Sequence, residues 1–543
     1  MVTQTWKLKA TSMDKKSKDW LIKILAKNRG LTNKAKLDKF LNPSLGDILS
    51  VKLTDIDKAV QRVKKAIESK EKVIVYSDYD ADGICATAIS WETFFDLGSN
   101  VLPYVPHRIK EGYGLSIDAI KELAATGVTL IITVDHGVTA TKQIEAAKRL
   151  GVDIIVTDHH ILPKVPPKPY ALVHSLELCG AGVAWRFCWE IVTKLAPQYK
   201  NKLIEKLELA AVATIADLVL LIGANRAIVK IGLEYLTKTK RPGLKSLIDN
   251  SGIGGPVGTY EIGHILAPRI NAMGRIEHGL DSLRLLCAKN QKQADTLAKL
   301  LSKTNTRRQD LTVSAVAGAI DMVDKDQLIG VVAHHEWHEG VIGLVASRLV
   351  ETHHRPMIVI SIGQIYSKGS ARSIAGFNIV EAIRASSEYL VDAGGHPMAA
   401  GFTIETRHIE DFSKKINVYA NQVLTDDMLT PVINIECKLE VNDINKQTWQ
   451  TIKAFEPFGV GNPQPIFLTE KILVEDVRGV GEGNKHLRLQ LDGVSAIGFN
   501  MGGQRVKLRP GYLMDVVYTL DENRFNGQSQ IQMKIKDLKT ADS

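Results

Sequence analysis

Acidic residues and histidines recur in this chain at positions that suit a reaction assisted by metal ions. Asp78, Asp80 and Asp82 alternate within residues 78–83, directly after an apolar stretch. If an extended strand continued through them, all three carboxylates would point to one side, where their repulsion requires a cation. A calcium-binding loop begins in the same way, but Ile89 stands where its glutamate belongs. By itself, the motif leaves a catalytic metal site, a calcium-type loop and a plain acidic turn open.

Further candidate ligands follow at three points along the chain. They are Asp135, the triplet Asp158-His159-His160, and Asp217. Each is a weak signal alone, because such triplets are common in polar turns and an aspartate after an apolar run often caps a helix. Together, the carboxylates and one or two imidazoles suit a pair of manganese or magnesium ions, which can assist an in-line displacement at phosphorus. No phosphate-binding loop of the form GxxxxGK[ST] competes with this prediction.

Apolar runs precede the first three of these clusters and are predicted strands. They cover residues 73–76, 128–134 and 153–156. A helix with apolar positions at three- and four-residue steps covers 55–69, and further helical stretches alternate with the strands. This alternation predicts an α/β domain with a parallel sheet and helices on both faces. Because ligand sites of such sheets lie beyond the carboxyl ends of the strands, we expect the acidic clusters to converge on one edge.

Changes in periodicity predict the order of the parts along the chain. They are an N-terminal helical segment (1–50), the metal-binding α/β domain (51–280), a long connecting helix (281–325), a second α/β domain (326–428) and a small β-barrel (429–543). In the second α/β domain, strands at 328–333 and 357–360 flank a helix at 343–350. The barrel is predicted from short β segments separated by glycine and asparagine turns.

The composition of the 543 residues is that of a soluble globular protein, with a net charge of +9. A basic chain permits a polyanionic partner such as nucleic acid. No apolar run reaches the ~18 residues that a membrane span needs, and the first residues lack a secretory signal, so we expect a cytoplasmic protein without membrane contact. The five cysteines are scattered and form no CxxC pair, so neither a structural zinc site nor a disulfide framework is predicted.

The acidic positions also carry a family resemblance. In order and spacing, Asp80 with Asp82, Asp135, the triplet at 158–160 and Asp217 resemble the DHH phosphoesterase superfamily. Local motifs are similar to its RecJ branch, among them Pro106-His107-Arg108, Gly112-Tyr113-Gly114, Ala267-Pro268-Arg269-Ile270-Asn271-Ala272, Trp337-His338, Ser370-Ala371-Arg372, Gly394-Gly395-His396 and Pro457-Phe458-Gly459. The resemblance covers nearly the whole chain. It implies a DHH phosphoesterase domain, a DHH-associated domain as the second α/β unit, and an OB-type barrel at the C-terminal end.

The resemblance implies a role for each matching residue. The catalytic residues would be Asp80, Asp82, Asp135, His159, His160 and Asp217, with His160 contacting the phosphate. The metal site would combine Asp80, Asp82, Asp135, His159 and Asp217 with the supporting acidic residues Asp78 and Asp158. Substrate contacts would come from Arg108, Arg269, Asn271, Arg275, His338, Ser370, Arg372, Gly394, Gly395 and His396. Among these, Ser370 and Arg372 suit a terminal 5′ phosphate.

Several positions keep two interpretations. In the predicted barrel, the candidates for holding a single strand are equally well explained as surface residues; they are Lys485, His486, Arg488, Arg524 and Phe525. The histidines at 334, 335 and 338 invite a zinc site, but we favour substrate contact for His338 and structural roles for His334 and His335. His136 is either a further metal ligand or a group that supports one.

The resemblance implies an exonuclease that degrades single-stranded DNA from 5′ to 3′, to mononucleotides, in recombination and repair. It implies two divalent metal ions, manganese or magnesium, and a helicase and a single-strand-binding protein as partners; a monomer is our default. One alternative is a DHH phosphodiesterase of short oligonucleotides or cyclic dinucleotides, although such relatives usually lack the first 50 residues and the barrel. The other is a non-catalytic single-strand-binding scaffold, which the intact aspartate set disfavours.

Overall fold

The computed structural model describes residues 4–10, 19–112, 114–525 and 528–541. The chain forms two compact units that interleave along the sequence. Unit 1 contains Leu53–Asp217 and Gly232–Pro431, together with the first five residues, and unit 2 contains Trp6–Lys52, Leu218–Ile231 and Val432–Ser543. Among the described residues, none of the helices combines the length and the apolar character needed to cross a membrane.

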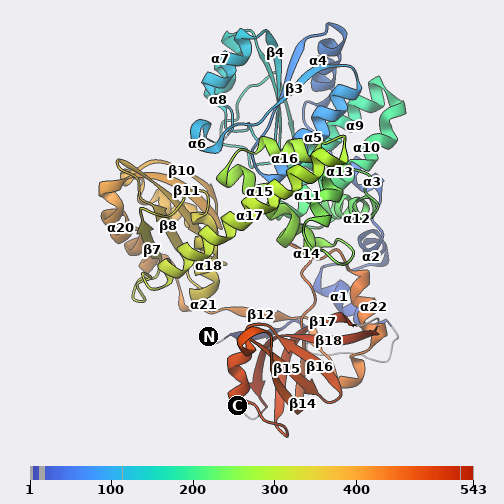
Figure 1. Ribbon diagram of the computed structural model, residues 1–543, viewed down its shortest axis with the longest axis vertical. Coiled ribbons are helices and arrows are strands. Elements are labelled where there is room, and N and C mark those ends of the chain that lie inside the picture. The colour runs from blue at the N-terminus through green and yellow to red at the C-terminus, as the bar shows by residue number, and fades with distance from the viewer. Residues whose placement is uncertain (1–3, 11–18, 113, 526–527, 542–543) are drawn as a thin grey trace. The chain divides into compact units, whose positions relative to one another are not determined.

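The first half of unit 1 is built on a parallel five-stranded sheet of order β3-β2-β4-β5-β6. The strands are β2 (Lys72–Tyr76), β3 (Asn100–Tyr104), β4 (Val128–Val134), β5 (Asp153–Asp158) and β6 (Ala171–His174). Helices α7 (Ile117–Ala125) and α8 (Thr141–Arg149) cover one face, and α4 (Ile56–Glu68), α5 (Ala81–Asp96) and α9 (Gly180–Leu195) cover the other (Figure 1). The central strands are apolar on both faces because both are buried. The predicted α/β class is confirmed.

The acidic motif does not continue strand β2. The strand ends at Tyr76, and Asp80 instead caps helix α5 by accepting hydrogen bonds from the backbone N–H groups of Asp82 and Gly83, both at 3.0 Å. Aspartate is among the best residues at this position because it satisfies backbone donors that the helix leaves unpaired. The three carboxylates are therefore displayed by a turn and the first turn of a helix, rather than by an extended strand.

Helices complete the first half of unit 1 and link it to the second. They are α10 (Lys200–Glu205), α11 (Leu207–Ala216), α13 (Pro242–Asp249), α14 (Thr259–Glu261), α15 (Ala267–Ile276), α16 (Leu280–Leu286) and α17 (Gln291–Ile320), and helix α12 (Gly223–Thr237) runs from unit 2 into unit 1. The structure thus divides the predicted connecting segment into α16 and the much longer α17. Asn290 causes the break, because its side chain caps α17 through the backbone N–H of Gln293 at 2.8 Å.

The second half of unit 1 contains a mixed five-stranded sheet of order β10-β11-β9-β8-β7. Its strands are β7 (Gly330–His334), β8 (Met357–Ser361), β9 (Tyr366–Arg372), β10 (Leu390–His396) and β11 (Ala399–Glu405), and its helices are α18 (Ile342–His353), α19 (Ile379–Arg384), α20 (Ile409–Val423) and α21 (Asp426–Leu429). Only the β7–β8 pair of this sheet is parallel, and it is joined through helix α18, whereas short turns join β8 to β9 and β10 to β11 as antiparallel neighbours. Phe402 and Phe412 pack at 5.0 Å in its core.

Unit 2 contains the C-terminal barrel. Its strands are β14 (Phe467–Val480), β15 (His486–Leu491), β16 (Val494–Gly498), β17 (Leu513–Phe525) and β18 (Gln528–Thr540), and pairing of β14 with β17 closes it. The predicted OB-type barrel is confirmed, although three strands are longer than the predicted segments. Short elements surround it, namely β1 (Thr5–Leu8), which pairs with β12 (Val432–Ile435), then β13 (Cys437–Lys438) and helix α22 (Lys446–Ala454).

Two N-terminal helices share the core of the barrel. They are α1 (Trp20–Asn28) and α2 (Lys34–Leu41), and the short helix α3 (Leu45–Leu49) follows them. Leu25 and Phe40 are buried in one cluster with Phe455 and Phe467. The buried guanidinium of Arg226 joins the same parts, because it donates to the backbone carbonyls of Phe40 at 2.7 Å and of residues 455–457 at 2.7 to 3.1 Å.

Candidate functional site

The predicted ligands converge at the carboxyl edge of the parallel sheet. Among the described residues, three overlapping groups bring their ligand atoms within 4.8 Å of one another. The groups are Asp78, Asp80 and Asp135; then Asp82, His159 and Asp217; and finally Asp135, His159 and His160. Asp135 and His159 each belong to two groups, so the site is continuous. These residues would together hold divalent cations.

Asp135 reaches the centre of the site through an unusual backbone. It follows β4 with a φ of 67°, in a region that residues other than glycine rarely adopt. Strain of this kind persists where the surroundings enforce it. Gly180 makes room for the side chain, because a Cβ atom there would lie only 2.3 Å from Asp135 Oδ1. A glycine at the start of α9 is therefore a condition for the position of this carboxylate.

Asp82 is held by the amino end of helix α9. Its two carboxylate oxygens accept hydrogen bonds from the backbone N–H groups of Gly180 at 2.7 Å and Ala181 at 2.6 Å. The positive end of a helix dipole favours a carboxylate there. Asn271, predicted as a substrate contact, instead accepts a hydrogen bond from the backbone N–H of Ala81 at 2.7 Å. It thereby ties α15 to the start of α5.

The electrostatics of the site call for cations. Burial and neighbouring carboxylates raise the pKa of Asp82 to about 7 and that of Asp217 to about 8, and they also raise the pKa values of Asp78 and Asp135. Burial and the neighbouring His160 lower the pKa of His159 to about 4, which leaves a neutral imidazole, the form that binds metals.

Two buried atoms in the site also lack a hydrogen-bond partner. They are Asp135 Oδ1 and His159 Nε2, which lie 3.1 Å apart. Buried polar atoms of native proteins are normally satisfied, so a missing partner requires an explanation. A divalent cation would satisfy both atoms and would offset the repulsion among the carboxylates. The residues present therefore fit divalent metal ions.

Asp158 lies behind this layer of ligands. Its oxygens accept hydrogen bonds from the backbone N–H groups of Val138, His159 and His160 and from His160 Nδ1 at 2.7 Å, and it belongs to none of the three groups. Although burial opposes it, the hydrogen bond and negative charge of Asp158 raise the pKa of His160 to about 9. The geometry favours Asp158 as the residue that orients His160 and stabilises its protonated form. The His396 ring stacks on His160 at 6.0 Å.

A basic cleft of about 390 Å³ opens beside the ligands. Tyr79, which stands between Asp78 and Asp80, lines it together with Arg108, Arg275, Lys368, Ser370 and Arg372. The amino end of α18 also faces it, because a Cβ atom on Gly343 would lie 2.9 Å from both Ser370 Oγ and Arg372. Guanidinium groups, a hydroxyl and a helix amino end are the groups that bind phosphate.

The remaining predicted substrate residues are more dispersed. Arg269 donates to the backbone carbonyl of Ile265 at 2.7 Å, while its buried Nε has no partner. Gly394 and Gly395 lie on the exposed edge strand β10, where Gly395 has a φ of 145°. His338 lines a separate cavity of about 370 Å³ with Trp337 and His334. Of the described histidines, none in that region joins a group with metal-ligand geometry.

His136 and the barrel candidates are placed as follows. The buried His136 ring bonds the backbone carbonyl of Tyr76 at 3.1 Å and joins none of the three ligand groups, so its position supports β2. His486 lies edge-on to the exposed Phe499 ring at 5.3 Å, next to Lys485 and near Arg488 along β15. The side chains of Arg524 and Phe525, and all of Tyr113, lie outside the described residues.

Sequence reasoning missed Lys368 and Gly180. Lys368, Ser370 and Arg372 alternate along β9 and share one face, so the two-residue period of a strand was a usable signal for the lysine. No sequence signal pointed to Gly180, because its role depends on its contact with Asp135, which is distant in the sequence.

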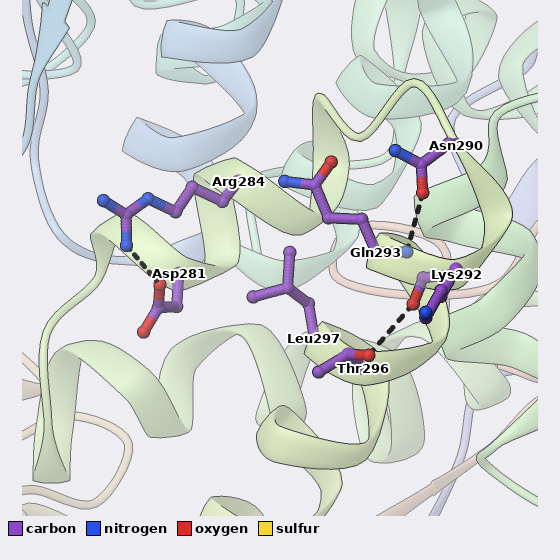
Figure 2. A pocket seen from close by; sticks show the side chains of 7 residues that line it. All are labelled: Asp281, Arg284, Asn290, Lys292, Gln293, Thr296 and Leu297. Carbon is purple, nitrogen blue, oxygen red and sulfur yellow. Dashed lines mark hydrogen bonds and ion pairs between the residues drawn. The ribbon is translucent and has the colours of Figure 1, made fainter.

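A larger hollow of about 520 Å³ lies apart from the site, between α16 and the start of α17 (Figure 2). Its polar side chains bond within the hollow itself: Arg284 pairs with Asp281 at 2.9 Å, and Asn290 caps α17. The larger volume of this hollow therefore does not make it the functional site.

Family profiles match three consecutive parts of the chain. They are the N-terminal domain of the DHH family at residues 72–221, the DHHA1 domain at 325–422 and the RecJ OB domain at 435–537. The single-stranded-DNA-specific exonuclease RecJ of Bacillus subtilis is 36% identical over 95% of this chain and 67% of its own length. The chain belongs to the RecJ family. RecJ of Thermus thermophilus is 34% identical over 90% of this chain and 71% of its own.

Solved RecJ structures share the architecture. The Thermus thermophilus RecJ in complex with Mn²⁺ superposes with a TM-score of 0.87 at 29% identity, covering 99% of this chain and 79% of that one. A further exonuclease RecJ bound to manganese gives a TM-score of 0.61 at 34% identity, covering 68% of this chain and 96% of that one. Both agree with the metal-binding character that the ligand geometry predicts here.

Proposed function

We propose that this protein is a metal-dependent exonuclease that degrades single-stranded DNA from its 5′ end. The observation that carries the proposal is the continuity between the ligand cluster and the basic cleft, since Tyr79 lines the cleft while its neighbours Asp78 and Asp80 belong to the cluster. Cleavage would thus occur close to a bound terminal phosphate. The family relatives named as single-stranded-DNA-specific exonucleases support the same substrate.

Asp78, Asp80, Asp82, Asp135, His159 and Asp217 would hold two manganese or magnesium ions. Bound there, the ions would supply Lewis-acid stabilisation to the attacking and leaving oxygens of an in-line displacement. Gly180 and the amino end of α9 fix Asp135 and Asp82, so the ligands are positioned before substrate arrives. Protonated His160, oriented by Asp158, would donate a hydrogen bond to a phosphate oxygen as negative charge develops on it.

Ser370, Arg372, Arg108 and Lys368 would bind the 5′ phosphate. A dianionic terminal phosphate gains most from several cations at once, whereas an internal phosphate carries a single charge. The cleft thereby favours a strand end over the middle of a strand. This preference makes the enzyme an exonuclease and gives it a direction.

The test uses a single-stranded oligonucleotide of ~30 nucleotides labelled at either end, with manganese, a duplex and an RNA of the same sequence alongside. We expect immediate release of the 5′ label as mononucleotide, a shortening 3′-labelled ladder, and no cleavage by Asp135→Ala. Asp118→Asn, on the surface of α7, is the matched control and should cleave normally. Cleavage of only two- to five-nucleotide substrates would replace this proposal with an oligonucleotide phosphodiesterase. Binding without cleavage would leave a scaffold.

The wider setting belongs to the same proposal. A helicase would supply single strands from duplex DNA, and a single-strand-binding protein would keep them open for the exonuclease during recombination and repair. We place this monomeric enzyme in the cytoplasm. Co-purification of a tagged protein and its elution volume on a sizing column test the partners and the monomer.

A further inference from the structure

Arg108 is the one cation of the basic cleft that comes from a short connecting segment. It begins α6 (Arg108–Glu111), between β3 and α7. Its guanidinium carbon lies 5.0 Å from the centre of the Tyr79 ring, which holds it over the cleft. The other cations of the cleft lie on longer elements, Lys368 and Arg372 on strand β9 and Arg275 on helix α15.

Arg108 shares the cleft with two other guanidinium groups, those of Arg275 and Arg372. Burial and then the charges of Arg108 and Arg372 lower the pKa of Arg275 to about 10, and burial and Arg108 also lower the pKa of Arg372. Like charges this close repel, and Glu339 and Asp392 in the same lining offset part of this repulsion. Arg108 lies on the shortest of the elements that carry the cations of the cleft. Its position in the cleft therefore depends on the contacts that hold its segment.

The backbone around Arg108 supplies little rigidity. A helix of four residues is too short to be stable on its own. Gly112 and Gly114, which follow it, adopt φ angles of 81° and 76°, where glycine moves at low cost. The conformation of the segment consequently depends on its side-chain contacts.

Among the described side chains of this segment, Glu111 makes two hydrogen bonds. One carboxylate oxygen accepts a hydrogen bond from the Tyr104 hydroxyl at 2.6 Å, and the other accepts one from the backbone N–H of His107 at 2.7 Å. Tyr104 ends strand β3 and stacks on Tyr76 of β2 at 4.7 Å, so the carboxylate is anchored to the rigid sheet. His107 directly precedes Arg108. Glu111 thus fastens both ends of α6 to the sheet that carries the metal ligands.

We propose that Glu111, anchored by Tyr104, is a positioning residue that holds Arg108 in the cleft and thereby sets the preference for a 5′-phosphorylated strand. This inference rests on the proposed function of the cleft as a 5′-phosphate site. Its physical basis is preorganisation, because a phosphate that meets a fixed guanidinium does not have to order the loop. The metal ligands are not involved.

The experiment compares initial rates on the same single strand with a 5′ phosphate or a 5′ hydroxyl, in manganese. The variants are Glu111→Gln, Tyr104→Phe, Arg108→Ala and the double variant of Glu111 and Arg108, with Glu145→Gln, exposed on α8, as a control of the same chemical type. We expect Glu111→Gln to reduce the phosphate preference about tenfold through a higher KM, because the segment loses charge-assisted hydrogen bonds that hold Arg108 in place. Tyr104→Phe should change it in the same direction, and Glu145→Gln should not.

The double variant separates positioning from a general structural effect. If Glu111 acts through Arg108, adding Glu111→Gln to Arg108→Ala removes no further preference, and the manganese dependence stays that of the wild type. Additive losses, or equal losses on both substrates, would overturn the inference while leaving the exonuclease intact. A wild-type enzyme that cleaves both strands equally would instead remove the 5′-phosphate site, and this inference with it. Absence of cleavage in every tube would be the distinct failure of the proposed function.

Discussion

At the scale of single residues, the site depends on a glycine as much as on its carboxylates. Asp135 occupies a strained backbone position and approaches Gly180 so closely that no side chain fits between them. Gly180 also donates its N–H to Asp82, so one residue shapes the positions of two ligands.

We expect Gly180→Ala to weaken manganese binding by about 10- to 100-fold, the range found when groups behind the metal ligands are altered. The added methyl group would displace Asp135, which belongs to two of the three ligand groups. The manganese concentration for half-maximal cleavage measures this effect. Gly254→Ala is the control, because a Cβ atom at Gly254 meets open space, and it should behave as the wild type. An unchanged manganese dependence in Gly180→Ala would contradict this account.

The predicted ligands came from spacing and from family resemblance, and the structure brings six of the seven into the ligand groups, together with His160. The supporting position of Asp158 was expected from the resemblance, but its contact with Val138, 20 positions earlier, was not. Asn271 was predicted to contact the substrate, and its supporting role could not be read from the sequence because its partner Ala81 lies 190 positions earlier.

At the scale of elements, a buried ion network links the helices that carry Asp82 and Asp217. Arg241 donates two hydrogen bonds to Glu92 of α5, at 2.7 and 3.0 Å, and one to Glu208 of α11, at 3.0 Å. Asp82 begins α5, and Asp217 directly follows α11. All three members of the network are largely buried.

Arg241→Met should destabilise the protein by about 3–5 kcal/mol, because it removes the guanidinium that bonds both buried carboxylates and leaves Glu92 only the Lys206 ammonium, 3.6 Å away. Urea unfolding of wild type and variant measures this loss. The exposed pair of Arg348 and Glu351, 2.7 Å apart on α18, provides the comparison, and Arg348→Met should cost less than about 1 kcal/mol. If the two substitutions lowered the free energy of unfolding equally, burial of the network would contribute nothing to stability.

The same network predicts a dependence of stability on acid. Burial alone would raise the pKa of Glu92, but the charge and hydrogen bonds of Arg241 outweigh it and lower the pKa from 4.5 to about 2. Since the folded-state pKa is depressed, this stabilisation is complete above pH 4.5 and disappears as the pH falls toward 2. The unfolding free energies of wild type and Glu92→Gln should therefore converge in this window, by up to about 1.4 kcal/mol per pH unit. A difference that stays constant from pH 6 to pH 3 would refute the assignment.

The sequence predicted the positions of strands wherever local periodicity determines them, as in β4 and β8. The predictions were less accurate where distant contacts decide. Helix α22 was missed in a region assigned to strands, although its Asn445 cap is a local signal, and the ends of β14, β17 and β18 are set by their partners around the barrel. Likewise, nothing near Arg241 in the sequence indicates that its partners are Glu92 and Glu208.

At the scale of the whole molecule, the metal ligands all belong to unit 1. Ions bound only by the folded state stabilise it by mass action, by about 2.7 kcal/mol at a hundred times the dissociation constant. Manganese should therefore raise the unfolding temperature of unit 1, while a transition of unit 2 should stay where it is. Calorimetry with manganese and with a chelator tests this, and Asp135→Ala should lose the shift. An equal shift of both transitions would contradict it.

The interleaving of the two units has a consequence for the order of synthesis. Arg29 bonds Asn462, 433 positions later, and Leu25 and Phe40 are buried against residues of the last hundred. During synthesis the helices α1 and α2 leave the ribosome before their partners in the barrel, so their apolar faces stay uncovered until residues beyond 455 have emerged. Unit 1 can fold during that interval, since its segments end at Pro431. The newborn protein thus holds a nearly complete catalytic unit before unit 2, whose segments lie on both sides of it in the sequence, can close.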